Sequence, residues 1–310
     1  MITPIEACRA WEEAGDGIGP GITPIFTYGE VKDASRIAQL FAGVEAVILG
    51  VERIDESVLH SCTRLKIISR FGIGYDAIDL EALQRRQIRL AITRGCMPYA
   101  VARQTIAFLM AMTFNLFDHN RRLKEGEWAR IANGSCPELT LGIVGLGSVG
   151  REVAMLARAL GYNVAAFNRS PAHCEGVYIS GSLRELIQRS DVVSLHVALT
   201  PETRGLVSGD VVNWLSGKSL INTARGGVVS EWEILEALNK GLLRYYATDV
   251  FSSEPIEGVS RDLARHERVV CTPHVGAFDR VTARLMLRQA VSNLVHCVNG
   301  EHEAVNAYVL

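Results

Sequence analysis

The sequence lacks the features that mark membrane-bound, secreted and nucleic-acid-binding proteins. Its 32 basic and 34 acidic side chains almost cancel, leaving a net charge of −2 over 310 residues. No strongly basic surface for nucleic acid or anionic lipid is therefore expected. No apolar run reaches the roughly 20 residues of a membrane-spanning helix, and no basic segment followed by an apolar one opens the chain. These absences predict a cytoplasmic protein that binds neither membranes nor nucleic acids.

Disulfide and metal motifs are also missing. The seven cysteines are scattered, without C-x-x-C pairs or the spacing of metal ligands: Cys8, Cys62, Cys96, Cys136, Cys174, Cys271 and Cys297. An odd number of unclustered cysteines is typical of free thiols in a reducing compartment. We therefore expect free thiols and no metal ion.

What the sequence does contain is a repeated alternation of short apolar segments and helical patterns, which predicts parallel α/β sheets. With 48% hydrophobic residues, the chain is long enough for two domains. The expected strands are Ile22–Tyr28, Val44–Gly50, Leu65–Arg70, Ile88–Thr93, Leu139–Val144, Asn163–Phe167, Val192–Ala198, Leu220–Thr223, Tyr245–Val250 and Val269–Cys271. The expected helices are Ile5–Ala14, Ser35–Phe41, Glu56–Ser61, Leu80–Gln87, Tyr99–Arg122 in more than one piece, Val149–Leu160, Ser182–Gln188, Glu231–Lys240 and Arg280–Asn299, with a loop at Gly15–Gly21.

The stretch 139–170 has the order of a dinucleotide-binding unit. An apolar strand runs into the turn Gly145-Leu-Gly147-Ser-Val-Gly150, which matches G-x-G-x-x-G and opens a helix. Gly145 allows the tight turn, Gly147 lets a pyrophosphate approach the backbone, and Gly150 lets helix and strand pack closely. The helix N-terminus offers N–H groups and a positive dipole end to the phosphates. The alternative is an ordinary glycine-rich turn.

The end of the next strand predicts which dinucleotide is preferred. A site for NAD usually has an acidic residue here, which binds the ribose 2′-hydroxyl and repels a 2′-phosphate. This chain has Asn168, Arg169 and Ser170 instead. Arg169 could pair with the phosphate and Ser170 could donate a hydrogen bond. We therefore expect NADP(H) to be preferred and NAD(H) to remain possible; a solvated arginine with mixed cofactor use is the alternative.

Four polar residues directly follow strands of the second half: Arg225, Asp249, Glu254 and His274. In open parallel sheets ligands bind beyond the carboxyl ends of the strands, so one cleft can collect all four. Reduction of a 2-oxo acid needs a proton donor, and a histidine with a carboxylate beside it suits that task. An arginine fork matches a substrate carboxylate and polarises a carbonyl.

At these residues the chain resembles the D-isomer-specific 2-hydroxyacid dehydrogenases, the phosphoglycerate dehydrogenase-like family. The resemblance extends from about Val44 to Gly300 and rests on RFGIGYDAIDL, LGIVGLGSVG, NTARGGVVSE, ATDVFSSEP and TPHVGA. It implies an α/β fold of two Rossmann-like domains with the active-site cleft between them. The flavodoxin-like substrate domain would hold residues 1–98 and 280–310, and the NAD(P)-binding Rossmann domain residues 99–279. It also implies a homodimer.

The resemblance assigns roles residue by residue. His274 matches the general acid/base, Glu254 its paired carboxylate, and Arg225 the arginine that binds substrate. The backbone N–H groups of Ile73 and Gly74 match the loop that holds the substrate carboxylate. Arg70, beside that loop, is a candidate contact for an anionic substrate tail. Cofactor contacts are expected at Gly145, Gly147, Ser148, Val149, Gly150, Asn168, Arg169, Ser170, His196, Thr203, Thr223, Ala224, Asp249 and Gly276.

The chain departs from the family pattern in three places. Arg103 stands where relatives often carry Glu, and Phe114 where they often carry Arg, so an ion pair on this helix is missing. His196 is followed by Val-Ala where relatives often read His-x-Pro. The segment Met1–Thr3 is too short for an obvious first strand, so we expect a reduced or rearranged first sheet.

Together these features predict an NADP(H)-preferring oxidoreductase that interconverts a 2-oxo acid and its D-2-hydroxy acid, acting in the cell as a reductase. The acid is open: glyoxylate, hydroxypyruvate, a phosphonopyruvate-like acid or a bulkier one would all fit. Two other functions also remain open. One is an NADP(H)-sensing binding protein like the family's corepressor branch, and the other is a dehydrogenase of another small anion such as phosphite.

Overall fold

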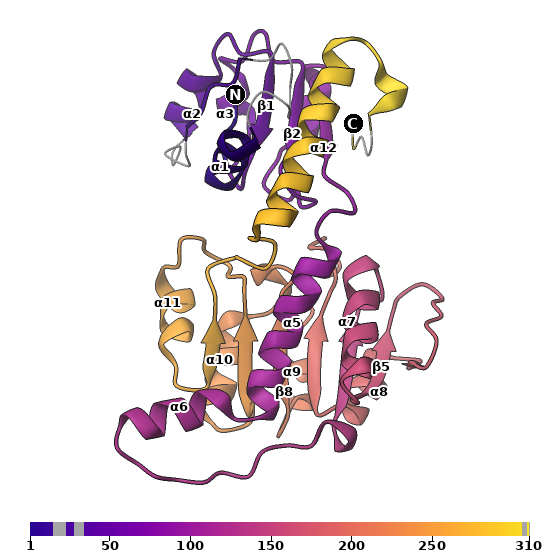
Figure 1. The fold of residues 1–310 in the computed structure, drawn as a ribbon. Helices are drawn as coiled ribbons and strands as arrows, with labels where there is room; N and C mark the ends of the chain where they lie inside the picture. The colour runs from indigo at the N-terminus through magenta and orange to yellow at the C-terminus, as the bar shows by residue number, and fades with distance from the viewer. Residues whose placement is uncertain (15–22, 28–33, 306–308, 310) are drawn as a thin grey trace. The chain divides into compact units, whose positions relative to one another are not determined.

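The computed structural model describes residues 1–14, 23–27, 34–305 and 309, which form two compact units (Figure 1). Unit 1 comprises Met1–Met97 and Ala277–Leu310, and unit 2 comprises Pro98–Gly276. The bounds expected from the sequence were 1–98 with 280–310, and 99–279. The expected loop Gly15–Gly21 lies outside the described residues.

Unit 2 is built on a seven-stranded sheet whose neighbouring strands all run parallel, in the order β10-β9-β8-β7-β4-β5-β6. The strands are β4 Thr140–Val144, β5 Asn163–Phe167, β6 Tyr178–Ile179, β7 Val192–Leu195, β8 Ser219–Asn222, β9 Tyr245–Thr248 and β10 Val269–Cys271. The chain leaves β4 toward β5 on one side and returns to β7 on the other. The turn after β4 therefore lies where the strand order reverses, which is where open α/β sheets bind ligands.

Helices cover both faces of this sheet, which explains why its strands read as unbroken apolar runs. The helices of unit 2 are α5 Pro98–Thr113, α6 Leu116–Lys124, α7 Ser148–Ala159, α8 Leu183–Arg189, α9 Asp210–Trp214, α10 Glu231–Asn239 and α11 Gly258–Arg265. Successive strand residues enter opposite cores: Leu220 packs in one cluster and Ile221 in the other. Figure 1 shows α5 running beside α7, and the two helices pack together on the face that includes Ile221.

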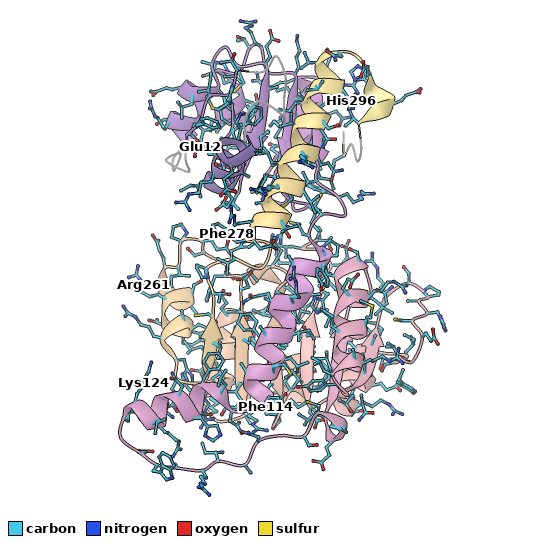
Figure 2. All side chains as sticks on the ribbon, in the orientation of Figure 1. Glu12, Phe114, Lys124, Arg261, Phe278 and His296 are labelled. Carbon is cyan, nitrogen blue, oxygen red and sulfur yellow. The ribbon has the colours of Figure 1, made fainter. Side chains whose placement is uncertain are left out.

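The long helical pattern after residue 98 is two helices, as expected. α5 and α6 are bent by 60° across a short break. Within the described residues no single helix is long and apolar enough to cross a membrane, and only this bent pair reaches the required length and composition together. Arg103 stacks on the Tyr99 ring at 4.2 Å to the centroid. Phe114 is partly exposed where α5 ends, and Figure 2 shows it near the start of α6.

Unit 1 has a three-stranded parallel sheet in the order β1-β2-β3. Its elements are α1 Ile5–Ala14, α2 Ala34–Phe41, β1 Ala46–Leu49, α3 Glu56–Leu59, β2 Ile67–Arg70, α4 Leu80–Arg85, β3 Arg89–Ile92 and α12 Arg280–Val298. α12 returns from the end of the chain to pack on α1 and on β2 (Figure 1). Ile2 makes isolated bridges to Phe26 and Ile48. In the described part of the chain the first sheet therefore has three strands, and Ile2 adds only isolated bridges to it.

Some expectations were wrong or incomplete. In the described part of the expected strand Ile22–Tyr28, only Phe26 forms a bridge, so no strand forms across residues 23–27. Three short elements were missed: β6, α9 and α11. β6 has two residues and α9 has five, too few to show a periodic pattern, and α11 begins at Gly258 and carries more polar than apolar residues. The expectation of free thiols is confirmed, since no disulfide bond is formed by the seven cysteines.

Candidate active site

The carboxyl ends of the unit 2 strands hold most of the residues singled out in the sequence. Gly145 follows β4, Asn168 follows β5, and His196 follows β7. Arg225, Glu254 and His274 come after the ends of β8, β9 and β10 respectively. Because neighbouring strands are parallel and in register, these ends share one edge of the sheet. The sheet topology therefore positions these residues along one edge.

His274 and Glu254 form a dyad. The His274 Nδ1 atom lies 2.7 Å from Glu254 Oε2, and Glu254 Oε1 accepts the Phe251 N–H at 2.9 Å. Burial alone raises the pKa of the Glu254 carboxyl. The hydrogen bond and charge of His274, together with the Phe251 N–H, outweigh burial and leave that pKa below its ordinary value. An ionised Glu254 holds a proton on Nδ1, which leaves Nε2 as the ring nitrogen that can exchange a proton.

The loop that carries His274 is held by Asp249. The His274 backbone has φ +55°, and its N–H donates to Asp249 O at 2.9 Å. Asp249 is only 3% exposed. Its carboxylate accepts hydrogen bonds from the N–H groups of Val275 at 2.8 Å and Gly276 at 2.7 Å. It also accepts the Thr272 hydroxyl at 2.5 Å. Asp249 and Gly276, both expected to contact the cofactor, thus bind each other and fix the loop.

Arg225 occupies the turn after β8, and its Nη1 donates to Ala224 O at 2.7 Å. The next residue, Gly226, is pressed against the loop after β9. A Cβ at Gly226 would lie 2.0 Å from Phe251 C and 2.3 Å from Ser252 N, so only glycine fits. The positive charge of Arg225 also helps to lower the pKa of Glu254. The turn at Arg225 and Gly226 is therefore in close contact with the loop from Phe251 to Glu254.

The glycine turn after β4 fits a dinucleotide. Gly145 has φ +95°, and a Cβ there would lie 2.5 Å from His196 O. A Cβ on Gly150 would lie 2.1 Å from Gly145 O. Gly147 differs, since no heavy atom lies within 4 Å of its Cβ position, and no side chain among the described residues caps α7. The first N–H groups of α7, at Ser148 and Val149, are thus left for a ligand such as a pyrophosphate.

Of the three residues after β5, Asn168 is half-buried and hydrogen-bonded within the chain, whereas Arg169 and Ser170 are exposed. Asn168 accepts the Leu146 N–H at 3.0 Å and donates to Ser170 O at 2.9 Å, which ties this end to the glycine turn. The Thr200 hydroxyl and, more weakly, the charge of Arg169 lower the pKa of Glu202, so an acidic group is near Arg169.

The remaining expected cofactor residues line these same turns. His196 Nε2 lies 2.8 Å from Ser194 Oγ, while its Nδ1 is buried with no partner among the described residues. Burial lowers the pKa of His196 to about 3, so the ring is neutral. Thr203 bonds Ala198 O at 2.5 Å within its loop, and Thr223 bonds Thr105 Oγ1 at 2.9 Å. An orphaned buried nitrogen is a polar position that a bound ligand can satisfy.

In unit 1 the substrate-binding candidates are Arg70, the last residue of β2, and the loop residues Ile73 and Gly74 after it. Arg70 donates to three carbonyl oxygens, those of Gly74 at 2.8 Å, Phe71 at 3.1 Å and Leu49 at 3.2 Å. These bonds tie the Arg70 side chain to backbone carbonyl groups of its own loop and of the end of β1. Within the described residues no hydrogen bond is recorded for the N–H groups of Ile73 or Gly74. The contact of Arg70 with a substrate tail stays a prediction.

Sequence reasoning missed the residues that support the site from within. Thr272 and Gln104 link the His274 loop to α5, with Gln104 Nε2 3.2 Å from Thr272 Oγ1. Glu231, at the start of α10, accepts the Ser252 N–H at 2.7 Å. These contacts join segments that are far apart in the chain, so no pattern of neighbouring residues in the sequence predicts them. The T-P-H order around His274 was the one available signal for Thr272.

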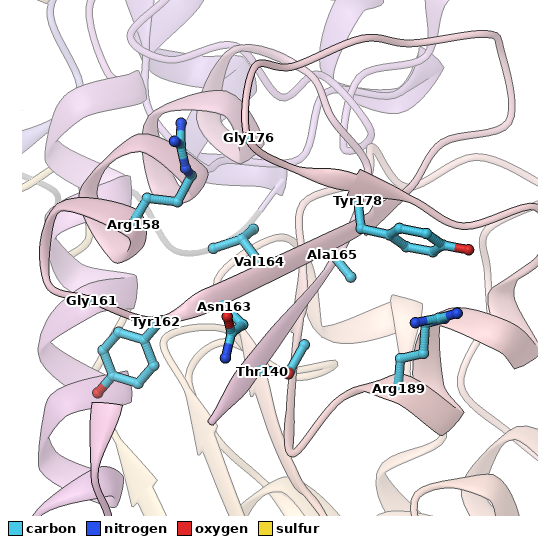
Figure 3. Close-up of a pocket in the computed structure, with 10 residues that line it drawn as sticks. All are labelled: Thr140, Arg158, Gly161, Tyr162, Asn163, Val164, Ala165, Gly176, Tyr178 and Arg189. Atoms are coloured by element: carbon cyan, nitrogen blue, oxygen red, sulfur yellow. The ribbon is translucent and has the colours of Figure 1, made fainter. Parts of the chain in front are cut away.

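A cavity of 680 Å³ in unit 2 lies away from these groups (Figure 3). It includes Thr140 and Asn163, the first residues of β4 and β5, and so lies toward the amino ends of the strands. Arg158 and Arg189 stand on either side of β5 in Figure 3. Among the described residues no group of three or more His, Cys, Asp or Glu side chains could hold a metal ion.

Comparisons with known proteins agree on one family. Residues 106–276 match the model of the D-isomer specific 2-hydroxyacid dehydrogenase, NAD binding domain. D-3-phosphoglycerate dehydrogenase of Methanocaldococcus jannaschii is 31% identical over 280 residues, 88% of this chain and 51% of that protein. Glyoxylate reductase of Aeropyrum pernix is 31% identical over 263 residues, 81% of this chain and 78% of that protein. The chain thus spans about half the length of the phosphoglycerate dehydrogenase it matches.

The fold is also shared with solved structures. The crystal structure of D-lactate dehydrogenase from Aquifex aeolicus, complexed with NAD and lactic acid, has a TM-score of 0.86 and 25% sequence identity. The alignment covers 99% of this chain and 98% of that one. The two-domain α/β fold expected from the sequence is therefore confirmed.

Proposed function

Because the chain belongs to the D-isomer specific 2-hydroxyacid dehydrogenase family, we propose that it interconverts a 2-oxo acid and its D-2-hydroxy acid with NADP(H) as the preferred cofactor. The observation that carries the proposal is the 2.7 Å contact between His274 Nδ1 and Glu254 Oε2 at the edge of the sheet where the glycine turn lies. The names of the relatives, a glyoxylate reductase and a D-lactate dehydrogenase, support a small 2-oxo acid as substrate.

In the direction of reduction, the protonated His274 gives its Nε2 proton to the carbonyl oxygen of the substrate. Glu254 holds the Nδ1–H throughout, which fixes the ring and stabilises its charged form. Arg225 binds the substrate carboxylate and stabilises negative charge as it develops on the oxygen. A bound reduced nicotinamide would supply the hydride to the carbonyl carbon. The N–H groups of Ile73 and Gly74 are proposed as further donors to the carboxylate.

The residues present fit a dinucleotide. Open space at Gly147 and the uncapped start of α7 suit the pyrophosphate. At the end of β5, Asn168 carries no charge that would repel a 2′-phosphate, and the exposed Arg169 is available to pair with it. An NADPH preference favours reduction as the direction in the cell.

We further propose that the protein is a homodimer. The surface formed by α6 and the segment after it exposes Leu116, Phe117, Leu123 and Trp128, with Trp128 80% exposed. Exposed apolar groups gathered on one surface mark a protein contact. Light scattering should give twice the chain mass of 33.9 kDa, and a monomer would reject this proposal.

The test of function is the loss of reduced-nicotinamide absorbance with purified protein, a panel of 2-oxo acids, and NADPH and NADH in parallel. Glyoxylate, hydroxypyruvate, a phosphonate-bearing oxo acid and a bulky oxo acid span the open choices. We expect turnover with at least one acid and a higher kcat/KM with NADPH. Binding of NADPH without turnover of any acid would instead favour a sensor or another substrate.

A further inference from the structure

Glu231 is a buried acidic residue that the proposed reaction does not use. It is the first residue of α10 and is 7% exposed. Burying a carboxylate is costly unless hydrogen bonds replace its water. Here Oε1 accepts the Ser252 N–H at 2.7 Å, and Oε2 accepts the Ser260 hydroxyl at 2.6 Å. The first of these two bonds reaches the loop that carries Glu254.

The Ser252 peptide is held from two sides. Glu231 binds its N–H, and Gly226 packs so closely that a Cβ there would lie 2.3 Å from Ser252 N. The peptide also follows Phe251, whose own N–H donates to Glu254 Oε1 at 2.9 Å. Glu231 therefore fixes the backbone at Ser252, one residue after Phe251, whose N–H binds Glu254.

We propose that Glu231 is a positioning residue for the dyad: its carboxylate clamps the Ser252 peptide against Gly226 and so holds Glu254 within hydrogen-bond distance of His274 Nδ1. The inference rests on the proposed function, in which this dyad supplies the proton. Small displacements of a reacting group can lower a rate by as much as a hundredfold. A residue that never touches substrate can therefore set the rate.

The rival explanation is that Glu231 only ties α10 to α11 (Gly258–Arg265) through its bond to Ser260. Three variants separate the two. Glu231→Ala removes both bonds, Ser260→Ala removes only the bond to α11, and Glu231→Gln keeps an oxygen for the Ser252 N–H and an amide donor for the Ser260 oxygen.

The experiment measures kcat, KM for NADPH, the pH profile of kcat/KM and the melting temperature of the full-length protein. We expect Glu231→Ala to lower kcat at least about tenfold with KM for NADPH within about twofold, since the cofactor turn is untouched. The pH profile of kcat/KM should also change, because the dyad that supplies the proton is no longer held in place. Glu231→Gln should restore kcat to within about threefold of wild type.

Ser260→Ala is the matched control. It should lower the melting temperature while leaving kcat and the pH profile unchanged. Equal losses of kcat in Glu231→Ala and Ser260→Ala, or an unchanged pH profile in Glu231→Ala, would overturn the inference. So would a Glu231→Gln variant as slow as Glu231→Ala. If wild type itself turns over no acid, the proposed function fails instead, so the two failures are distinguishable.

Discussion

The two ends of the seven-stranded sheet differ in what their charged groups do. At the amino end, beside the 680 Å³ cavity, Arg158 donates to Glu175 O at 2.6 Å and Arg189 pairs with Glu185 at 3.3 Å. At the carboxyl end, Glu254 orients His274 while the His274 Nε2 remains for a substrate. The arginines beside this cavity therefore bind groups of their own chain. Groups arranged for proton transfer, more than cavity size, identify the candidate active site.

The largest expected effects come from truncating the proposed catalytic groups. His274→Ala and Arg225→Ala should each lower kcat/KM at least about a hundredfold with folding intact, since the proton donor or the carboxylate fork is lost. Circular dichroism and steady-state kinetics on the preferred acid measure both points.

Arg189→Ala is the control from the opposite end of the sheet. It removes an arginine of the same unit whose partners are Glu185 and the Tyr178 ring. Turnover should stay within about twofold of wild type, because exposed ion pairs contribute little. A loss of turnover as large as that of Arg225→Ala would contradict the assignment of the active site to the carboxyl ends of the strands.

Within the carboxyl end, two glycines should respond in opposite ways. Gly145→Ala places a Cβ 2.5 Å from His196 O at a backbone φ of +95° and should cost about 2 kcal/mol or more of unfolding free energy. Gly147→Ala meets no atom within 4 Å and should cost less than about 1 kcal/mol, yet raise the Kd for NADPH about tenfold by crowding the pyrophosphate. Urea unfolding and fluorescence titration with NADPH test the pair; a Gly147→Ala protein with wild-type affinity would count against the phosphate position.

The cofactor preference can be sharpened at the end of β5. Arg169→Ala should raise KM for NADPH about tenfold and KM for NADH less than twofold, because a charge-assisted bond to the 2′-phosphate is lost. Glu202→Gln should act in the opposite direction, lowering KM for NADPH about twofold by removing a nearby negative charge. Parallel kinetics with both cofactors decide the matter, and equal changes for NADPH and NADH would reject the phosphate contact.

The sequence predicted best what local chemistry dictates. The turn at Gly145 follows from neighbouring residues and forms as expected. The sequence could place Asp249 at a strand end but could not show that its carboxylate holds the His274 loop. Glu231 looked like an ordinary first-turn acid of a helix. Partners such as Ser252 are distant in sequence, so packing alone reveals what these carboxylates hold.

The last expected effect is on how stability depends on pH, and it concerns His196. Burial lowers the pKa of His196 to about 3, below the ordinary value of 6.5, so between these values the unfolded chain binds a proton that the folded chain does not. The contribution of His196 to stability is therefore complete above about pH 6.5 and is lost as pH falls toward 3, by up to about 1.4 kcal/mol per pH unit. His196→Gln should flatten the fall in unfolding free energy between pH 7 and 5. Urea unfolding of both proteins across this range isolates the effect, because His266, whose pKa burial also lowers, is unchanged in the variant. Equal slopes for the two proteins would mean that the His196 ring is solvated, which would remove the orphaned nitrogen as support for a ligand at this end of the sheet.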